Sequence, residues 1–304
     1  MLYRPLGATG LRVSEIGYGC ASWWGQKAFP EDEALRLVHY AIDQGVTLFD
    51  TSPAYSGGNA EPRLGRALKG LDTSKLIVAT KAGTRFVGGR VRRDMSLAAI
   101  EQDILKSLVT LGLETLPVLQ LHGPDPSELT PEFEDGLLAL KRRGLFQALG
   151  ANSFDPVVLD LIIASPAFDL VMMDVNVLRP ERKTQLKAAK AAGKGVLAGM
   201  PLAMGHTNLQ ILKIRGVRDL WYAARALKNH RHDISAGARF RFLNQVEGIS
   251  GAQAALSYVL SHSEISCAVV GATRQTHLAE DLAASGLTLP PDLARRIIET
   301  QMRR

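Results

Sequence analysis

Residues 45–68 read GVTLFDTSPAYSGGNAEPRLGRAL, and this stretch combines three local signals. A short run at 47–50 ends at Asp50, a turn-rich segment with Pro53 and two glycines follows, and apolar residues then recur at helical spacing. A short apolar run that is bounded by turn residues indicates a buried strand, whereas apolar residues three and four apart indicate an amphipathic helix. The stretch therefore predicts one strand–loop–helix unit.

The same alternation of strand and helix recurs along the whole chain. Strands are predicted at 15–19, 47–50, 76–81, 118–122, 148–151, 170–174, 195–198 and 267–270. Helical patterns occur at 31–44, 60–68, 96–111, 132–142, 156–163, 181–192, 252–260 and 276–284. Eight such alternations are typical of a closed parallel barrel, so the sequence predicts an α/β fold of the (β/α)8 TIM-barrel class.

Three segments lie outside this repeat. Residues 2–17 place a Gly-Ala-Thr-Gly turn between two extended pieces, which predicts a β-hairpin that caps the bottom of the barrel. The stretch 201–246, after the seventh strand, is too long for an ordinary connection, and loops of that length are usually functional. Pro290 and Pro291 open a last helix. Because no change in composition marks a second domain, residues 1–304 are expected to form one domain.

Composition limits the class of protein. The chain has 304 residues, of which 46% are hydrophobic, so it can bury a large core. It has neither an apolar run of about 18 residues nor a signal-peptide pattern, so a soluble cytoplasmic protein is expected. Cys20 and Cys267 are the two cysteines and have no CxxC spacing. We therefore expect two buried thiols, with no disulfide framework and no metal site.

The positive charge of the chain is concentrated in one segment. The formal net charge is +6, and residues 213–241 carry eight Lys or Arg residues against two Asp. Such a segment is either a solvated basic helix face or a surface that meets phosphate groups of a ligand. Because RNA-binding motifs, aromatic arrays and zinc-finger spacings are missing from the sequence, nucleic acid is not an expected partner. A small molecule is expected, and the oligomeric state stays open.

Four chemically active residues fall at the ends of successive predicted strands or just beyond them. Asp50, Lys81 and His122 close the second, third and fourth strands, and Tyr55 lies in the loop after Asp50. Barrel enzymes build their sites at the C-terminal ends of the strands, so these side chains are expected to converge. A tyrosine has an ordinary pKa of about 10, and a neighbouring ammonium lowers it by roughly 1–3 units. The set predicts proton transfer to a carbonyl oxygen.

The motifs around these residues occur in the order found in one known family. The stretch at 45–68, then ATKAG at 79–83, LQLHGPD at 119–125 and GANS at 150–153, resembles the aldo-keto reductase superfamily. The opening RPLGATGLRVSEIGYG and the closing GATRQTHLAEDLAA are also similar to that family's N-terminal hairpin and C-terminal cofactor segment. The resemblance therefore covers nearly the whole chain.

This resemblance implies a role for each of the four residues. Tyr55 would donate the proton to the carbonyl oxygen, and Lys81, held by Asp50, would lower the pKa of Tyr55. His122 would orient the carbonyl group. Hydride would come from C4 of a nicotinamide, the reaction could also run backwards as an alcohol oxidation, and no metal would be required.

The cofactor contacts that the resemblance implies are partly altered. The chain has no GxGxxG fingerprint, which agrees with a cofactor that lies extended across the top of the barrel. Asn152 and Ser153 would hold the carboxamide of the nicotinamide, in the reverse of the family's usual order. Met172 stands where the family usually has glutamine. In the string that also includes Pro201 and Leu202, Gly199 stands where an aromatic residue commonly stacks on the nicotinamide, and Met200 is the nearest replacement.

The segment that would bind the adenosine end of the cofactor also departs from the family pattern. Gly271 and His277 stand where the family often has cations that grip the 2′-phosphate, which leaves Arg274 as the local cation. Thr273 and Arg274 would lie near the phosphate and Asp281 near the adenine amino group. Because a guanidinium binds phosphate bidentately, NADP is the favoured cofactor and NAD the alternative.

Substrate contacts and the direction of the reaction stay open. Trp23, Trp24 and Trp221 are candidate substrate contacts, although each could equally pack as part of the barrel or the loop. The favoured function is an NADP-dependent oxidoreductase that reduces an aldehyde, ketone or sugar carbonyl. The alternatives are an NAD-dependent sugar or alcohol dehydrogenase of the same fold, and a cofactor-binding regulatory protein with little turnover.

Overall fold

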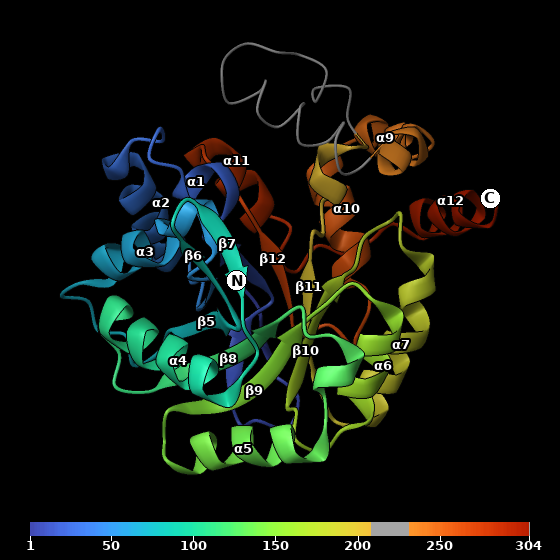
Figure 1. Ribbon diagram of the computed structural model, residues 1–304. Helices are drawn as coiled ribbons and strands as arrows, with labels where there is room; N and C mark the ends of the chain where they lie inside the picture. Colours follow the sequence, from blue (N-terminus) through green and yellow to red (C-terminus); the bar gives the residue numbers. More distant parts are fainter. Residues whose placement is uncertain (208–230, 304) are drawn as a thin grey trace.

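Eight parallel strands close into a barrel in the computed structural model, which describes residues 1–207 and 231–303 (Figure 1). The strands follow the order β10-β11-β12-β3-β4-β5-β8-β9, and the barrel closes where Ala268 of β12 pairs with Ile16 of β3. They are β3 (Ile16–Gly19), β4 (Leu48–Asp50), β5 (Ile77–Ala82), β8 (Leu116–His122), β9 (Phe146–Asn152), β10 (Leu170–Asp174), β11 (Gly195–Gly199) and β12 (Cys267–Val270). The predicted (β/α)8 fold is confirmed.

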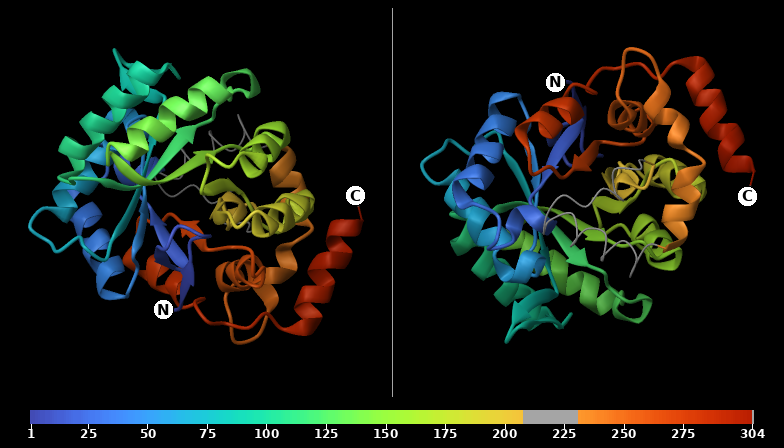
Figure 2. Two further views of the ribbon diagram at one scale, coloured as in Figure 1. Left: turned by 90° about the horizontal axis from the view of Figure 1, so that it is seen from below. Right: turned by 90° about the horizontal axis from the view of Figure 1, so that it is seen from above.

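Helices surround the barrel on the outside, as the two axial views show (Figure 2). They are α2 (Glu31–Asp43), α3 (Ala60–Leu68), α4 (Leu97–Leu111), α5 (Pro131–Arg142), α6 (Pro156–Ala164), α7 (Lys183–Ala191), α10 (Gly251–Leu260) and α11 (Gln275–Leu282). Several begin at a capping side chain: the Thr130 hydroxyl accepts from the amide of Phe133, and Ser250 forms a capping box with Gln253. Such caps satisfy amides that the first helical turn leaves unbonded, so they set where each helix begins.

The N-terminal hairpin closes the bottom of the barrel. β1 (Tyr3–Pro5) and β2 (Arg12–Ser14) pair antiparallel, which confirms the predicted hairpin. Leu6 and Val13 are fully buried and pack in one cluster with interior residues of the barrel strands, such as Leu48. Side chains alternate between the two faces of a strand, so residues of the cluster that share a strand are two positions apart, as Leu170 and Met172 of β10 are.

Two short elements were not predicted from the sequence. Helix α1 (Ser22–Gly25) follows β3, and a hairpin of β6 (Thr84–Val87) and β7 (Arg90–Arg93) follows β5. Every residue of β7 is exposed, so its sequence lacks the alternation of apolar and polar residues that marks a half-buried strand. Helix α1 has four residues, which is too short for a helical period to be recognised.

The structure describes the two ends of the long segment after β11, up to residue 207 and from residue 231. Its described part contains η4 (Ala203–Gly205), α9 (Arg231–Ala238) and η6 (Arg241–Gln245). Trp221, Tyr222 and most of the basic residues noted in the sequence lie at 208–230, outside the described residues. The predicted last helix is present as α12 (Pro291–Met302) and packs on the barrel through Gln301, whose amide donates to Val177 and Tyr258.

Both cysteines are free and fully buried, as the sequence predicted. Burial raises the pKa of each thiol, and the nearby Asp50 carboxylate raises it further. Among the described residues, no helix has the length and hydropathy needed to cross a lipid bilayer.

Candidate active site

The candidate active site continues the interior-facing series of the barrel strands. Leu48, Ala79 and Val118 belong to the interior cluster, and two residues further along the same strands stand Asp50, Lys81 and Gln120. His122 follows Gln120 by two more residues and therefore lies on the same face of β8. A cavity of about 710 Å³ opens above them and is lined by Asp50, Tyr55 and His122 among others. The alternation of the strands thus brings the predicted residues together.

The ammonium of Lys81 is held by two oxygen acceptors beneath the cavity. Its Nζ donates to Asp50 Oδ1 at 2.6 Å and to the carbonyl of Thr51 at 3.0 Å. The amide of Gln120 donates to the same Asp50 oxygen at 3.0 Å. The Lys81 side chain is fully buried, and burial alone would lower its pKa, but Asp50 and Tyr55 raise the pKa above its ordinary value. Lys81 is therefore an ammonium at neutral pH.

Tyr55 lies between Lys81 and His122. It begins the turn η1 (Tyr55–Gly58), and Lys81 Nζ lies 4.8 Å from the centroid of its ring. The ring of His122 meets it edge-on, with centroids 5.5 Å apart and planes at 89°. The tyrosine is half-buried and lines the cavity, so a ligand in the cavity can reach it.

His122 is neutral, and its Nδ1 atom is hydrogen-bonded to side chains of the protein. Burial, and then the charge of Lys81, lower the pKa of His122 to about 3. Nδ1 is hydrogen-bonded with Thr84 Oγ1, and Ser52 Oγ lies 3.4 Å from it. Ser52 Oγ already accepts from the amide of Ala54, which leaves its own O–H to donate. Hydroxyls that donate to Nδ1 place the ring proton on Nε2.

Gln120, Ser52 and Thr84 are site residues that the sequence reasoning missed. A usable signal existed for Gln120, which lies two positions before His122 on the same face of β8. Ser52 lies beyond the end of β4, where the alternation of the strand no longer places side chains. Thr84 gave no such signal, since it belongs to β6, one of the two strands of the unpredicted hairpin.

Most residues predicted to bind the nicotinamide end of a cofactor line the cavity: Asn152, Met172, Gly199, Pro201 and Leu202. Ser153 is buried beside them; its amide donates to the carbonyl of Met172 and its hydroxyl accepts from the amide of Asp155. A Cβ added to Gly199 would lie 3.3 Å from Met172 Cε. Met172 and Gly199, which both depart from the family pattern, are therefore neighbours, and the methionine fills the space beside the glycine.

The residues predicted at the adenosine end are divided: Gly271 and Thr273 line the cavity, whereas Arg274, His277 and Asp281 do not. Arg274 is exposed and immediately precedes α11, and His277 is exposed on that helix. Asp281, by contrast, is buried, and burial followed by the charge of Glu280 raises the pKa of its carboxyl to about 8.

The predicted substrate contacts separate into three cases. Trp24 lines one wall of the cavity but is only 1% exposed, and its indole donates to the carbonyl of Ala34 at 3.1 Å, so it is mainly a core residue. Trp23 is half-buried and packs against the core, and it is not among the described residues that line the cavity. Trp221 lies outside the described residues.

Backbone strain is concentrated at the rim of this cavity. Among the described residues, five non-glycine positions have positive φ, and four of them, Ser22, Ser56, Met200 and Met204, line the cavity. Each such conformation costs on the order of 1 kcal/mol or more and persists where the surrounding structure enforces it, commonly at functional sites.

Comparison with known proteins identifies the family. The model of the aldo/keto reductase family matches residues 15–301. The chain belongs to this family. It is therefore an oxidoreductase of the aldo-keto reductase type, and the resemblance seen in the sequence is confirmed.

Individual relatives match over nearly their full length. The chain is 30% identical to L-galactose dehydrogenase of Arabidopsis thaliana over 92% of this chain and 87% of the relative. The glycerol dehydrogenase AKR11B4 from Gluconobacter oxydans is 25% identical, with a TM-score of 0.81 over 99% of this chain and 95% of that structure. The holo form of aldo-keto reductase AKR11C1 from Bacillus halodurans has the same fold, with a TM-score of 0.82 at 24% identity over 99% and 96%.

Proposed function

We propose that this aldo-keto reductase reduces the carbonyl group of an aldehyde, ketone or sugar, with Tyr55 as proton donor and a nicotinamide dinucleotide as hydride source. The observation that carries the proposal is the buried Lys81 ammonium, held by Asp50 and placed against Tyr55 at the base of an open cavity. A charged lysine beside a tyrosine stabilises the phenolate that remains when the tyrosine gives up its proton.

Proton transfer is expected to proceed from the Tyr55 hydroxyl to the oxygen of the bound carbonyl. The Lys81 ammonium stabilises the resulting phenolate, and Asp50 and the Thr51 carbonyl prevent the ammonium from turning away. General acid catalysis of this kind typically accelerates a reaction by a factor of about 10²–10⁴.

His122 is expected to bind the same carbonyl oxygen as a neutral donor. With Nδ1 accepting from hydroxyl groups, Nε2 carries the proton and can donate to an oxygen in the cavity. A neutral donor adds no charge beside Lys81, in agreement with the lowered pKa of the imidazole.

The cavity residues fit an extended dinucleotide. The bound nicotinamide supplies the hydride. Asn152 carries an amide that can pair with a carboxamide at the cavity wall. At the other end, a Cβ added to Gly271 would meet only the Gly19 carbonyl, at 3.8 Å, so the backbone after β12 is open to a close-lying ligand. Arg274, exposed just beyond Thr273, supports NADP over NAD, because its guanidinium can grip a 2′-phosphate.

The test of the proton donor is Tyr55→Phe. This variant is expected to lose at least about 10² in kcat for carbonyl reduction with NADPH while the fluorescence titration of NADPH binding stays nearly unchanged. Tyr40→Phe, at a half-buried tyrosine of α2, is the matched control and should keep full activity. Wild-type turnover in Tyr55→Phe would remove Tyr55 from the role. NADPH binding by the wild type with no oxidation over a broad carbonyl panel would favour a regulatory protein.

A second candidate is an NAD-dependent dehydrogenase that oxidises a sugar or polyol. Two observations favour it: the glycine at position 271 and the exposed His277 stand where phosphate-binding cations are usual, and two relatives are named as L-galactose and glycerol dehydrogenases. Measuring kcat/KM for both cofactors in both directions separates the candidates. A strong preference for NAD in alcohol oxidation would replace the first proposal, whereas the role of Tyr55 would stand in either case.

A further inference from the structure

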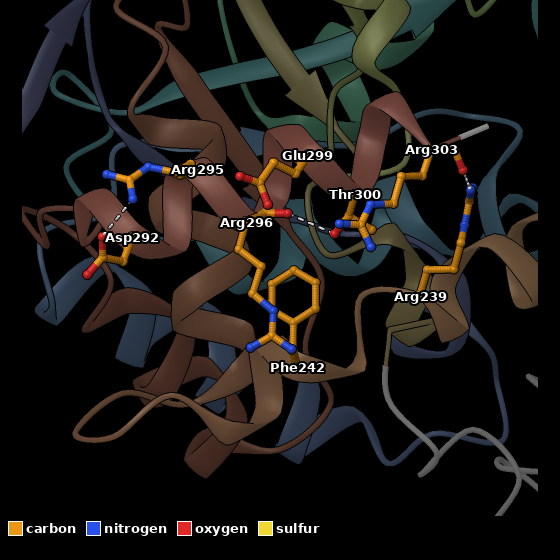
Figure 3. A pocket seen from close by; sticks show the side chains of 8 residues that line it. All are labelled: Arg239, Phe242, Asp292, Arg295, Arg296, Glu299, Thr300 and Arg303. Carbon is orange, nitrogen blue, oxygen red and sulfur yellow. Dashed lines mark hydrogen bonds and ion pairs between the residues drawn. The ribbon is translucent and has the colours of Figure 1, made fainter.

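A second cavity of about 660 Å³ lies on the outside of the barrel, where α12 meets η6 and the segment just after α9 (Figure 3). Its walls come from two parts of the chain that are far apart in sequence. The lining residues are Arg239, Phe242, Asp292, Arg295, Arg296, Glu299, Thr300 and Arg303. We call this cavity the arginine pocket.

Charge in the arginine pocket is unbalanced. Four guanidinium groups and two carboxylates line it, which leaves a formal excess of two positive charges. Arg295 and Asp292 pair with one another at 3.5 Å, on an exposed turn of α12. Within residues 1–207 and 231–303, the side chains of Arg239, Arg296 and Arg303 form no ion pair with a carboxylate. These three cations remain available to an anion from solvent.

Two of these guanidinium groups are held in place before any ligand binds. The Arg296 guanidinium lies 4.1 Å from the centroid of the Phe242 ring, and Phe242 is itself only 7% exposed (Figure 3). Arg239 Nη1 donates to the backbone carbonyl of Arg303 at 2.7 Å, which ties the segment after α9 to the end of α12. A guanidinium stacked on a ring keeps its N–H edge free, and a fixed edge loses less entropy when it binds a planar or tetrahedral anion.

The arginine pocket is separate from the catalytic cavity. The two cavities share no lining residue, and η6 lies between them: Phe242 faces the arginine pocket and Asn244 lines the catalytic cavity. The residues expected to bind the cofactor, including Arg274, do not line the arginine pocket. The arginine pocket is therefore built from residues other than those proposed for carbonyl reduction.

We propose that the arginine pocket binds a small phosphate-bearing molecule. Arginine binds phosphate through paired, charge-assisted N–H···O bonds, and two guanidinium groups from different elements can grip neighbouring oxygens of one phosphate or of a pyrophosphate. The pocket opens to solvent, and its volume is within the range of small-molecule sites. It can therefore accommodate a ligand that is larger than a phosphate group.

The test is calorimetric titration of the full-length protein with inorganic pyrophosphate at low ionic strength. The wild type is expected to bind one pyrophosphate, and the double variant Arg239→Gln/Arg296→Gln should bind it at least about tenfold more weakly, which is the loss of one charge-assisted interaction. Arg296→Lys keeps the charge but not the planar fork, so it should also weaken binding. Inorganic phosphate and sulfate, titrated separately, show whether one phosphate group suffices.

The matched control is Arg90→Gln/Arg92→Gln, which removes the same charge from the exposed strand β7. Equal weakening by both double variants would show general electrostatic attraction and overturn the proposal, as would unchanged binding in Arg239→Gln/Arg296→Gln. Repeating the titration with saturating NADPH separates the pocket from the catalytic cavity, since pyrophosphate bound at a dinucleotide site would be displaced. Failure of NADPH to bind would count against the proposed function and leave the test of the pocket intact.

Discussion

We expect Thr84, together with Ser52, to determine which nitrogen of His122 carries the proton. Both hydroxyls meet Nδ1, and burial keeps the imidazole neutral, so the ring can donate from Nε2 only while Nδ1 accepts. Thr84→Val keeps the shape of the side chain and removes the hydroxyl. We expect kcat for reduction to fall by about tenfold or more, because removing a hydrogen-bond donor from the reacting oxygen typically costs about 10²–10³ in kcat. Nitrogen NMR of the His122 ring should show a larger share of the Nδ1–H tautomer.

The control for this prediction is Thr84→Ser, which restores the hydroxyl and should restore both the tautomer and kcat. The NMR measurement needs no substrate, so it tests the tautomer even if the reaction is not carbonyl reduction. An unchanged Nε2–H tautomer in Thr84→Val would show that Ser52 alone fixes the ring and that Thr84 only packs against it.

Asp281 makes the stability of the protein depend on pH. Its carboxyl has a pKa of about 8 in the folded protein against an ordinary value near 3.8, because it is buried. The folded state therefore holds a proton that the unfolded state has lost between about pH 4 and pH 8, so the free energy of unfolding falls as pH rises through this window and levels off above it. Asp281→Asn stays neutral and should be the more stable protein at pH 8.

The measurement for Asp281→Asn is urea unfolding at several pH values from 5 to 9. The stability gain of the variant over the wild type should grow with pH up to about 8 and amount to several kcal/mol at most. Asp43→Asn, at an exposed position of α2, should show a difference that does not change over this range. A flat difference for Asp281→Asn as well would mean that its carboxyl is ionised throughout.

At the scale of residues, functional side chains at the ends of strands could be predicted from the sequence, whereas a contact between side chains on adjacent strands could not. Asp50, Lys81 and His122 close apolar runs, and closed barrels bring strand ends together, so their convergence could be predicted. The contact between Met172 and Gly199 could not be predicted, because the two residues lie on adjacent strands and each substitution taken alone indicated only a lost contact. The functional roles of all these residues stay predictions.

At the scale of elements, helix α1 and the turn η1 fit together only because position 25 is glycine. A Cβ added to Gly25 would lie 2.6 Å from Ser56 Cβ and 2.9 Å from Ala60 Cβ, and it would also meet the Ser56 hydroxyl. Ser56 directly follows Tyr55 and is itself strained, with φ of 55°. Gly25→Ala should push η1 outward and misplace the Tyr55 hydroxyl, lowering kcat by about 10² for a displacement near 1 Å.

The second variant in this test removes the two clashing atoms of Ser56 and leaves the contact with Ala60 Cβ. Ser56→Gly deletes both contacting side-chain atoms and relieves the positive φ, so Gly25→Ala/Ser56→Gly should regain part of the lost kcat. Activity is measured beside far-UV circular dichroism, which should stay unchanged in all three variants. Full activity in Gly25→Ala would show that the turn can move without carrying Tyr55 with it.

Most elements of the barrel could be predicted because each one has its own periodic signal. The runs at 170–174 and 267–270 coincide with β10 and β12, since buried parallel strands are continuously apolar. The unpredicted elements stand at the rim, where tertiary contacts and not periodicity fix the backbone. The β6–β7 hairpin is an example: Arg93 is held there by Asp125 and Glu128 of a neighbouring loop.

At the scale of the whole molecule, the two ends of the chain are fastened together by one buried carboxylate. Glu15 is 1% exposed; it accepts from Arg4 and from Ser285 and Gly286, near the C-terminal end of α11. Arg4 also donates to the carbonyls of Leu260, the last residue of α10, and Ile265, which precedes β12 by two residues. The hairpin beneath the barrel and the strand that closes it are therefore joined by the same side chains.

Removing Arg4 should consequently destabilise the closed barrel as a whole. Arg4→Met leaves the Glu15 carboxylate buried without its cation, which costs about 3 kcal/mol. Because the barrel closes on itself and the chain is expected to be one domain, urea unfolding followed by circular dichroism and by tryptophan fluorescence should give coincident transitions that shift together.

The control variant is Arg12→Met, on the exposed side of the same hairpin. Arg12 donates one hydrogen bond to the Tyr3 carbonyl, so its loss should cost about 1 kcal/mol or less. Separate transitions for the two probes would show that the hairpin or another part unfolds on its own, and that the chain holds more than one cooperative unit.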